Sequence, residues 1–445
     1  MTTWPIVGDG KSIRPSHITT LQDAINGVQD GTVPIALAGI ADALGTWVPS
    51  TGVVANARAG RVSILDYAHL VSGGDWQPAI QAAIDSEAGI IDYPITATSY
   101  TTLSPLVPKS NQIHRSATGL QYRHTVTSVP RARIKGDFDG PVFAPTGVDG
   151  VSFDGLTITG SNNAAHGDSV GVKGTTARFC TIRNCMFDAF GGAAVEWVSG
   201  VVLELNRNFT TNCRLKTTGH SDYVGVFDLS YHDPIVSYNE VGSNQAAIDT
   251  GYVAAIVMRG SNGFFFGNQA EISEVGIVVT GSWNSFLGNR ADLNWAQGWI
   301  VPGKFNRFVG NWSHQNGQET TDTYDAFWVT STGQGNLFVG NNVTWNSSGN
   351  VCRYGFASAA EFSDASQCTF IGNAVQLGAA ATGDYNLTAY DGMARFVGRR
   401  FIAYGGLGVG NSATATTLGT VTKKIEVFDA AGVSLGFVPV YGSIT

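Results

Sequence analysis

The sequence is poor in charged residues, and this shortage excludes several functions. Asp, Glu, Lys and Arg make up 13% of the 445 residues, about half the share of an average soluble domain. The 26 basic residues are outnumbered by 34 acidic ones, which gives a formal net charge of -8. Binding to nucleic acid depends on a dense basic surface that contacts phosphates. Nucleic acid is therefore not expected as a partner.

The sequence also lacks an apolar run long enough to span a bilayer, so membrane insertion is not expected. Its first residues, Met1-Thr2-Thr3-Trp4, lack the basic start and the apolar segment of a secretory signal. We therefore expect synthesis in a reducing cytosol. The five cysteines form no Cys-x-x-Cys pair and no cluster with histidine, which predicts buried free thiols rather than disulfides or a zinc site.

Glycine, by contrast, is abundant: its 56 residues are about double the average share. From about residue 150 to residue 400 the chain repeats a short phrase, an apolar residue followed closely by Gly-Asn or a variant of it. The clear copies end at Asn268, Asn289, Asn311, Asn341 and Asn373, and degenerate copies end at Asn184, Asn206 and Asn239. The shortest separations are 21 and 22 residues, and the longer ones indicate the same unit with 7 to 12 additional residues.

A second phrase, Gly or Ala followed by two apolar residues, lies between the asparagines, as in Gly276-Ile277-Val278 and Gly298-Trp299-Ile300. Two or three short strands in about 22 residues, with Gly and Asn at the corners, are typical of one coil of a parallel β-solenoid. A propeller would need about four strands in each repeat of forty-odd residues. We expect the asparagines to adopt the left-handed corner conformation and to stack in hydrogen-bonded ladders along the axis. The predicted fold class is therefore all-β.

Three regions are expected along the chain. Residues 1–60 have no clear period and are predicted to be a separate, irregular region. Residues 61–400 are predicted to form the solenoid, with a helix at 75–86 that is capped by Asp75 and covers its first coil. Residues 401–445 are predicted to form a C-terminal β region, with a hairpin between 424 and 441 that packs on the solenoid or on another copy of the chain.

Several of these segments together resemble phage tailspikes and the wider pectate-lyase-like superfamily of right-handed parallel β-helices. They are a short strand at 62–67, the helix at 75–86, a strand ending at Pro94, and the closing stretch Leu435-Gly436-Phe437-Val438-Pro439-Val440-Tyr441. The resemblance implies a homotrimer that binds and depolymerises a bacterial surface polysaccharide, whether capsule, exopolysaccharide or O-antigen. It also implies a place in the virion tail, attachment to the tail or baseplate through the N-terminal region, and release of the protein by lysis.

The candidate catalytic residues follow from the stacking of coils about 4.8 Å apart. Glu271, Asp292 and His314 each come three residues after a repeat asparagine, which predicts one outward column on three consecutive coils. In this prediction the flanking Ile272 and Leu293 point inward. Two carboxylates side by side need a shared proton, a cation or His314 to offset their repulsion. Such a pair is typical of a retaining glycosidase, so we predict an endo-acting glycoside hydrolase.

Other site residues are predicted around this column. Glu274 and Trp295 each come six residues after an asparagine and should also be neighbours. Glu274 with Asp325, two coils further on, is a second catalytic pair at the longer spacing of an inverting enzyme. The additional residues of the long coils concentrate between the asparagine corner and the next strand, where loops are expected to form a binding wall. The predicted substrate-binding residues are Trp295, His314, Tyr252, Tyr324, Tyr223 and Asp249.

Alternatives remain open at this point. The polar columns could be a solvated outer face, and the protein could be a receptor-binding fibre without catalysis. A polysaccharide lyase or epimerase is a further alternative, and no cofactor is expected unless a lyase uses Ca2+ bound by Glu271, Asp292 and Glu274. The phrase His232-Asp233-Pro234 only partly matches the Asp-Pro-His-Asp phrase of alginate-epimerase-like β-helices and is interpreted as a loop feature.

Overall fold

The computed structural model forms two units, Met1–Val397 and Gly398–Thr445. It describes residues 60–116, 131–161, 167–213, 222–242, 252–345, 351–358, 368–377, 381, 383–386, 395–397, 421–428 and 434–441. The expected attachment region thus lies outside the described residues except for Gly60. None of the described residues forms a helix of the length and apolar character needed to cross a membrane.

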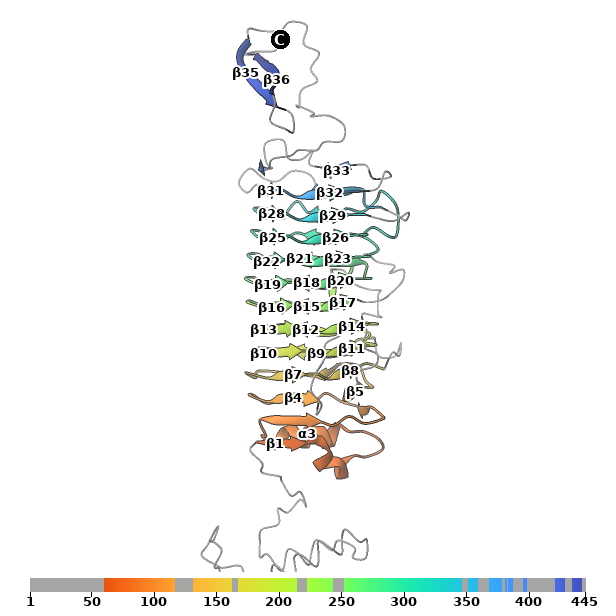
Figure 1. Cartoon of the computed structure of the whole chain (residues 1–445). Coiled ribbons are helices and arrows are strands. Elements are labelled where there is room, and N and C mark those ends of the chain that lie inside the picture. The colour runs from red at the N-terminus through yellow and green to blue at the C-terminus, as the bar shows by residue number, and fades with distance from the viewer. Residues whose placement is uncertain are drawn as a thin grey trace, which may run out of the picture. The chain divides into compact units, whose positions relative to one another are not determined.

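The first unit is a solenoid of three parallel sheets, and most coils contribute a strand to each sheet in turn (Figure 1). The first sheet has 13 strands: β1 (Arg61–Ser63), β2 (Ile90–Tyr93), β4 (Ile113–Ser116), β7 (Ser152–Asp154), β10 (Ala177–Arg183), β13 (Gly200–Asn206), β16 (Ile235–Ser237), β19 (Phe264–Phe266), β22 (Ser285–Leu287), β25 (Arg307–Val309), β28 (Leu337–Val339), β31 (Thr369–Ile371) and β34 (Arg395–Val397).

The second sheet has 11 strands: β3 (Tyr100–Thr102), β5 (Arg133–Gly136), β8 (Thr157–Thr159), β11 (Met186–Asp188), β14 (Phe209–Thr211), β17 (Glu240–Gly242), β20 (Gln269–Glu271), β23 (Arg290–Asp292), β26 (Trp312–His314), β29 (Asn342–Thr344) and β32 (Ala374–Gln376). The third sheet has 10 strands: β6 (Pro141–Phe143), β9 (Val170–Gly174), β12 (Val195–Trp197), β15 (Val224–Leu229), β18 (Val253–Met258), β21 (Val275–Val279), β24 (Trp299–Val301), β27 (Phe327–Val329), β30 (Tyr354–Ser358) and β33 (Gly383–Asn386). The predicted parallel solenoid is confirmed.

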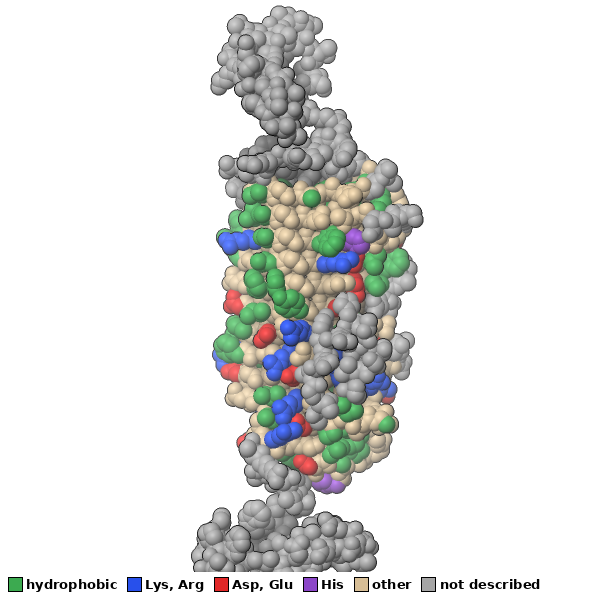
Figure 2. Space-filling model, viewed as in Figure 1, with side chains coloured by type: hydrophobic (Ala, Val, Ile, Leu, Met, Phe, Trp, Pro, Cys, Tyr) green, Lys and Arg blue, Asp and Glu red, His purple; other side chains and the backbone are tan. Residues whose placement is uncertain are grey.

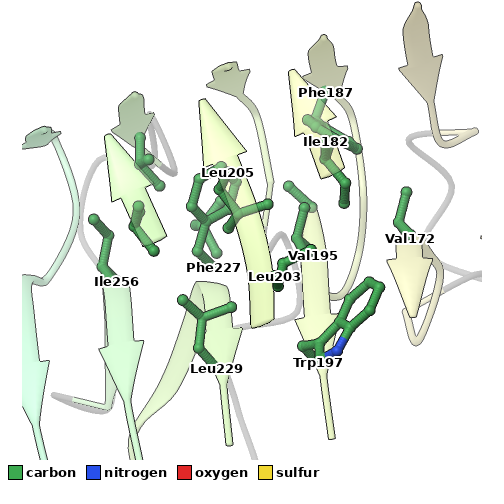
Figure 3. Packing of buried hydrophobic residues seen from close by; sticks show 14 of the residues in the cluster. Val172, Ile182, Phe187, Val195, Trp197, Leu203, Leu205, Phe227, Leu229 and Ile256 are labelled. Carbon is green, nitrogen blue, oxygen red and sulfur yellow. The ribbon is translucent and has the colours of Figure 1, made fainter. Parts of the chain in front are cut away.

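The interior is filled by side chains that stack on their counterparts one coil away. Figure 3 shows Val172, Val195, Phe227 and Ile256 from successive strands of the third sheet pointing into this core. Along the first sheet, five phenylalanine rings stack with centroids 4.5, 5.1, 4.7 and 4.8 Å apart, and they belong to Phe265, Phe286, Phe308, Phe338 and Phe370. All five cysteines are free and buried, as predicted.

The corner between the first and second sheets holds the predicted asparagine ladder, but its members and its left-handed residue differ from the prediction. The amide groups of consecutive asparagines hydrogen-bond to one another from Asn208 to Asn373, so Asn206 and Asn184 are not members. The left-handed residue is the one before each asparagine, for example Gly288 with φ 60° and Tyr238 with φ 55°. Glycine tolerates this backbone conformation, which leaves the buried asparagine free to bond along the axis.

The other two corners carry shorter ladders that the repeat analysis did not identify. In one, the Oδ1 atoms of Asn284, Asn306 and Asn336 accept the backbone N–H groups of the preceding coil at 2.7 to 2.8 Å. In the other, Asn294 Oδ1 accepts the Ser273 N–H, and Asn316 Oδ1 accepts the Asn294 N–H. Each ladder pairs buried backbone groups at a bend, where the strands themselves supply no partner.

One end of the solenoid is formed by η1 (Ile64–Leu70) and α3 (Gln77–Asp85) (Figure 1). The strand predicted at 62–67 ends at Ser63, because Ser63 and Asp66 cap each other's backbone and start the short helix η1. The predicted helix at 75–86 is confirmed as α3, and Asp75 Oδ1 accepts the Gln77 N–H at 2.9 Å. In the second unit, β35 (Val421–Phe428) and β36 (Ser434–Tyr441) form the predicted antiparallel hairpin.

Candidate functional site

Strands β20, β23 and β26 of the second sheet place the predicted column together. Glu271 is in register with Asp292, and Asp292 is in register with His314. The predicted inward orientation of Ile272 and Leu293 is wrong, because both residues take the left-handed corner conformation with φ 46° and 53°. Leu293 is 38% exposed as a result.

The two neighbouring carboxylates of this column have different partners. Asp292 is 4% exposed, and its two oxygens contact Arg290 Nη2 at 2.5 Å and His314 Nδ1 at 2.7 Å. The prediction required a proton, a cation or His314 to offset the repulsion between Glu271 and Asp292. Arg290 and His314 offset the charge of Asp292. Figure 2 shows acidic, basic and histidine side chains beside one another at the level of β23 and β26.

Glu271 instead shares a hydrogen bond with Glu240, a residue that the sequence analysis missed. Glu240 is 5% exposed, and its burial, together with the hydrogen bond and the charge of Glu271, raises its pKa to about 8. Gln269 Nε2 also donates to the Glu271 carboxylate. Glu240 therefore holds a proton at neutral pH next to a carboxylate that is accessible from outside.

The position of Glu240 in the repeat could have identified it. Glu240 directly follows the ladder residue Asn239, and its counterparts on the next coils are Gln269, Arg290 and Trp312. Residues one and three positions after the asparagine both point outward from a short strand. The sequence analysis considered only the third and sixth positions.

Arg290 contacts residues of both outward columns on the second sheet, those one and three positions after the ladder asparagine. Its guanidinium lies 5.0 Å from the centre of the Trp312 ring, and its Nη2 lies 3.1 Å from His314 Nδ1. Trp312 is 39% exposed and donates from Nε1 to Thr344 Oγ1 at 2.6 Å. An exposed ring beside a cation and several carboxyl groups is suited to binding a sugar, because the ring offers an apolar face and the polar groups bond hydroxyls.

A second carboxyl cluster lies at the following corner, between β20 and β21. The Trp295 N–H donates to the Ser273 carbonyl, which sets Trp295 level with Glu274 as predicted. Glu274 is 3% exposed, and its Oε2 accepts no hydrogen bond from any described residue. Burial and the charge of Glu319 raise its pKa to about 7. Glu319 in turn accepts a hydrogen bond from the Tyr324 hydroxyl.

The remaining predicted residues have other partners. Both oxygens of Asp325, which is 1% exposed, contact Arg353, at 3.1 and 2.9 Å. The carboxylate whose charge acts on Glu274 is therefore Glu319 and not the predicted Asp325. The rings of Tyr223 and Tyr252 lie edge to face at 5.6 Å. Asp249 lies outside the described residues.

The predicted position of the long loops is confirmed by the strand bounds. The connection from the second to the third sheet is short after β20 (Gln269–Glu271) and long after β14, β17, β26 and β29. Within the described part of the chain, no group of three or more His, Cys, Asp and Glu side chains is arranged to hold a metal ion.

No protein-family model and no curated protein matches this chain. Its fold is nevertheless that of several solved structures. A mutant tailspike protein of E. coli bacteriophage HK620 in complex with a pentasaccharide aligns with a TM-score of 0.54 at 12% identity, over 73% of this chain and 65% of that one. The A-module of mannuronan C-5 epimerase AlgE4 from Azotobacter vinelandii aligns with a TM-score of 0.53 at 15% identity, over 76% of this chain and 100% of that one.

The enzymatically active domain of tailspike protein 2 from bacteriophage CBA120 gives a TM-score of 0.52 at 13% identity, over 74% of this chain and 52% of that one. This chain is a right-handed parallel β-helix. The fold that the sequence resemblance implies is thereby confirmed. At these identities the likeness carries no information on the residues that act.

Proposed function

We propose that this protein binds a bacterial surface polysaccharide and cleaves it by hydrolysis of glycosidic bonds. The observation that supports this best is the contrast between neighbouring carboxyl groups on the second sheet. Glu240 keeps a proton and shares a hydrogen bond with Glu271, whereas Asp292 contacts Arg290 and His314. A carboxyl group that keeps a proton near a second carboxyl group with basic partners is what acid–base cleavage of a glycoside needs.

In this proposal the pair Glu240–Glu271 is the acid. The proton held by Glu240 passes across the hydrogen bond to Glu271, the half-buried member, and from there to the leaving glycosidic oxygen, so both carboxyl groups are ionised after the transfer. Asp292 lies one coil away, about 5 Å along the axis. When Arg290 and His314 turn from it to the bound sugar, Asp292 either attacks the anomeric carbon or takes the proton of the attacking water. Arg290 and His314 cover Asp292 and would contact the bound sugar. Glu274 contacts the adjoining sugar unit and donates a hydrogen bond to it while protonated.

The proposal is tested with the full chain and a panel of capsular polysaccharides and lipopolysaccharides, by measuring new reducing ends. Glu271→Gln and Asp292→Asn should each lower turnover at least about 100-fold while binding is kept. Asp188→Asn is the matched control, because Asp188 lies in the same column but pairs with the amide of Asn212. Binding with no reducing ends in the unmodified protein would instead identify a receptor-binding fibre.

The contact between His314 Nδ1 and Asp292 Oδ1 favours one other function, removal of a sugar-ring proton by an oriented histidine, as in a lyase or epimerase. A lyase creates an unsaturated sugar that absorbs ultraviolet light, and an epimerase creates no new ends. The charge of Glu271 would repel the uronic acid on which such enzymes act. We therefore prefer hydrolysis of a bond between uncharged sugars.

As a tailspike, the protein would be a homotrimer attached to the phage tail through its N-terminal region. This part of the proposal rests on the shared fold and on the C-terminal hairpin β35–β36. Light scattering of the purified chain should give about three times 46.9 kDa. A monomer would contradict the tailspike assignment without affecting the proposed chemistry.

A further inference from the structure

Five consecutive coils turn from the third sheet into the first through a residue in the left-handed conformation. Backbone hydrogen bonds from Asn262 to Ser282, from Trp283 to Lys304 and from Phe305 to Gln334 set these residues side by side. They are Asp233, Asn262, Trp283, Phe305 and Gly335, with φ of 62°, 60°, 64°, 56° and 66°. Asp, Asn and Gly tolerate this conformation, whereas bulky residues rarely adopt it. Trp283 and Phe305 are therefore strained where an asparagine would fit.

The two strained rings face solvent rather than the core. Trp283 is 60% exposed and Phe305 is 37% exposed. Their rings stack with centroids 4.6 Å apart and an angle of 20° between planes. The Phe305 ring also lies on the bare backbone of Gly335, where a Cβ would come within 2.4 Å of it. Strain at an exposed position that adds nothing to the core is a reason to look for a ligand.

Two positively charged side chains accompany the rings. Lys304 directly precedes Phe305, and Arg307 follows it by two residues at the start of β25; both are exposed. In the part of the chain that the structure describes, neither forms an ion pair. Unpaired cations beside an exposed aromatic face favour an anionic ligand that also has an apolar surface.

We propose that Trp283, Phe305, Lys304 and Arg307 form a second binding site, for an acidic sugar unit of a polysaccharide. The apolar face of the sugar ring packs on Trp283, and its acidic group pairs with Arg307 and Lys304. The site lies at the corner between the third and first sheets, whereas the carboxyl cluster lies on the second sheet. Figure 2 shows apolar side chains gathered along the side of the solenoid that carries the first sheet. The two sites would hold different units of one polymer, and neither proposal requires the other.

The test is binding of the full chain to polygalacturonate and alginate as acidic probes and to dextran as a neutral probe. We expect retention by the acidic polymers, weakened at high salt, and little retention by dextran. Trp283→Asn should lower binding at least about tenfold while the melting temperature stays the same or rises, because asparagine suits the left-handed corner. Arg307→Gln should weaken binding about threefold to fivefold and reduce its salt dependence.

Phe179→Asn is the matched control. Phe179 is 59% exposed and has φ 55°, but no ring stacks on it among the described residues. Its replacement should leave binding unchanged. Equal retention by dextran and the acidic polymers, or unchanged binding by Trp283→Asn, would overturn the proposal. A lower solution mass of Trp283→Asn would also overturn it and would make this corner a contact between copies of the chain.

Discussion

Glu240 and Glu271 lie on consecutive coils of the solenoid, and a hydrogen bond joins their carboxyl groups. The bond requires a proton, which the buried Glu240 keeps with a pKa of about 8. The folded protein therefore binds this proton more tightly than the unfolded chain does. Between about pH 4.5 and pH 8, the free energy of unfolding should fall as the pH rises, because Glu240 loses its proton more readily when unfolded.

Glu240→Gln should remove this loss of stability. The amide can still donate to Glu271, but it does not titrate. At about pH 9 we expect the variant to be more stable than the unmodified protein by about 2 to 3 kcal/mol, and at about pH 4 the two should be similar. Urea unfolding at several pH values measures this. Glu204→Gln, on the first sheet, is the control, and a similar gain from it would refute the assignment to Glu240.

The asparagine ladder should contribute strongly to stability. Asn289 Nδ2 donates to Phe265 O and Asn311 Oδ1, and its Oδ1 accepts two hydrogen bonds from Asn268. Asn289→Ala leaves these buried groups without partners, which should cost about 3 kcal/mol or more. Asn342→Ala, on the outer side of β29, should cost less than about 0.5 kcal/mol. Equal losses would mean that the ladder adds little.

The glycine that precedes each ladder asparagine allows a separate prediction, because a side chain there would be disfavoured only by the left-handed backbone conformation. Gly288 has φ 60°, and a Cβ there would meet no atom within 4 Å. Gly288→Ala should therefore cost about 1 kcal/mol through backbone strain alone. Gly288→Asn should cost clearly less, because asparagine adopts this conformation more readily. A large loss for both variants would indicate a steric clash, contrary to this account.

The repeat predicted the fold because each coil needs the same corner chemistry. A glycine that permits the left-handed turn and an asparagine that bonds along the axis recur together at Gly288-Asn289 and Gly310-Asn311. The prediction of a ladder residue was wrong where a residue other than glycine takes the left-handed position. Arg207, with φ 54°, stands in place of the glycine before the ladder residue Asn208. Without that glycine, the repeat pattern predicted Asn206 instead of Asn208. Strand pairing is thus readable from sequence wherever the corner is regular.

The site could be predicted only in part. Register follows from the repeat, so Glu271, Asp292 and His314 could be placed in one column before the structure was known. Which carboxyl group keeps a proton depends on burial and on side-chain direction, and neither is encoded by spacing. Glu240 was overlooked for this reason, and Glu274 was paired with Asp325, which Arg353 holds, rather than with Glu319.

The ion pair of Asp325 predicts a structural role for this residue. Asp325 is 1% exposed and contacts Arg353 through both oxygens. Asp325→Asn should lower the free energy of unfolding by about 1 to 3 kcal/mol, because a buried charged hydrogen bond is lost. Turnover of the folded variant, measured well below its melting temperature, should remain within about threefold of the unmodified protein. A large loss of turnover with unchanged stability would restore Asp325 as a catalytic candidate.

Glu274 should instead affect the pH dependence of substrate binding. Its pKa of about 7 means that it can donate a hydrogen bond to a sugar hydroxyl below that pH and loses this ability above it. The KM of the unmodified protein should therefore rise as the pH passes about 7, while Glu274→Gln, which always donates, should show no such rise. Glu319→Gln removes the negative charge that helps to raise the pKa of Glu274, so the rise in KM should move to lower pH. If Glu319→Gln leaves the profile in place, the group that titrates is not Glu274.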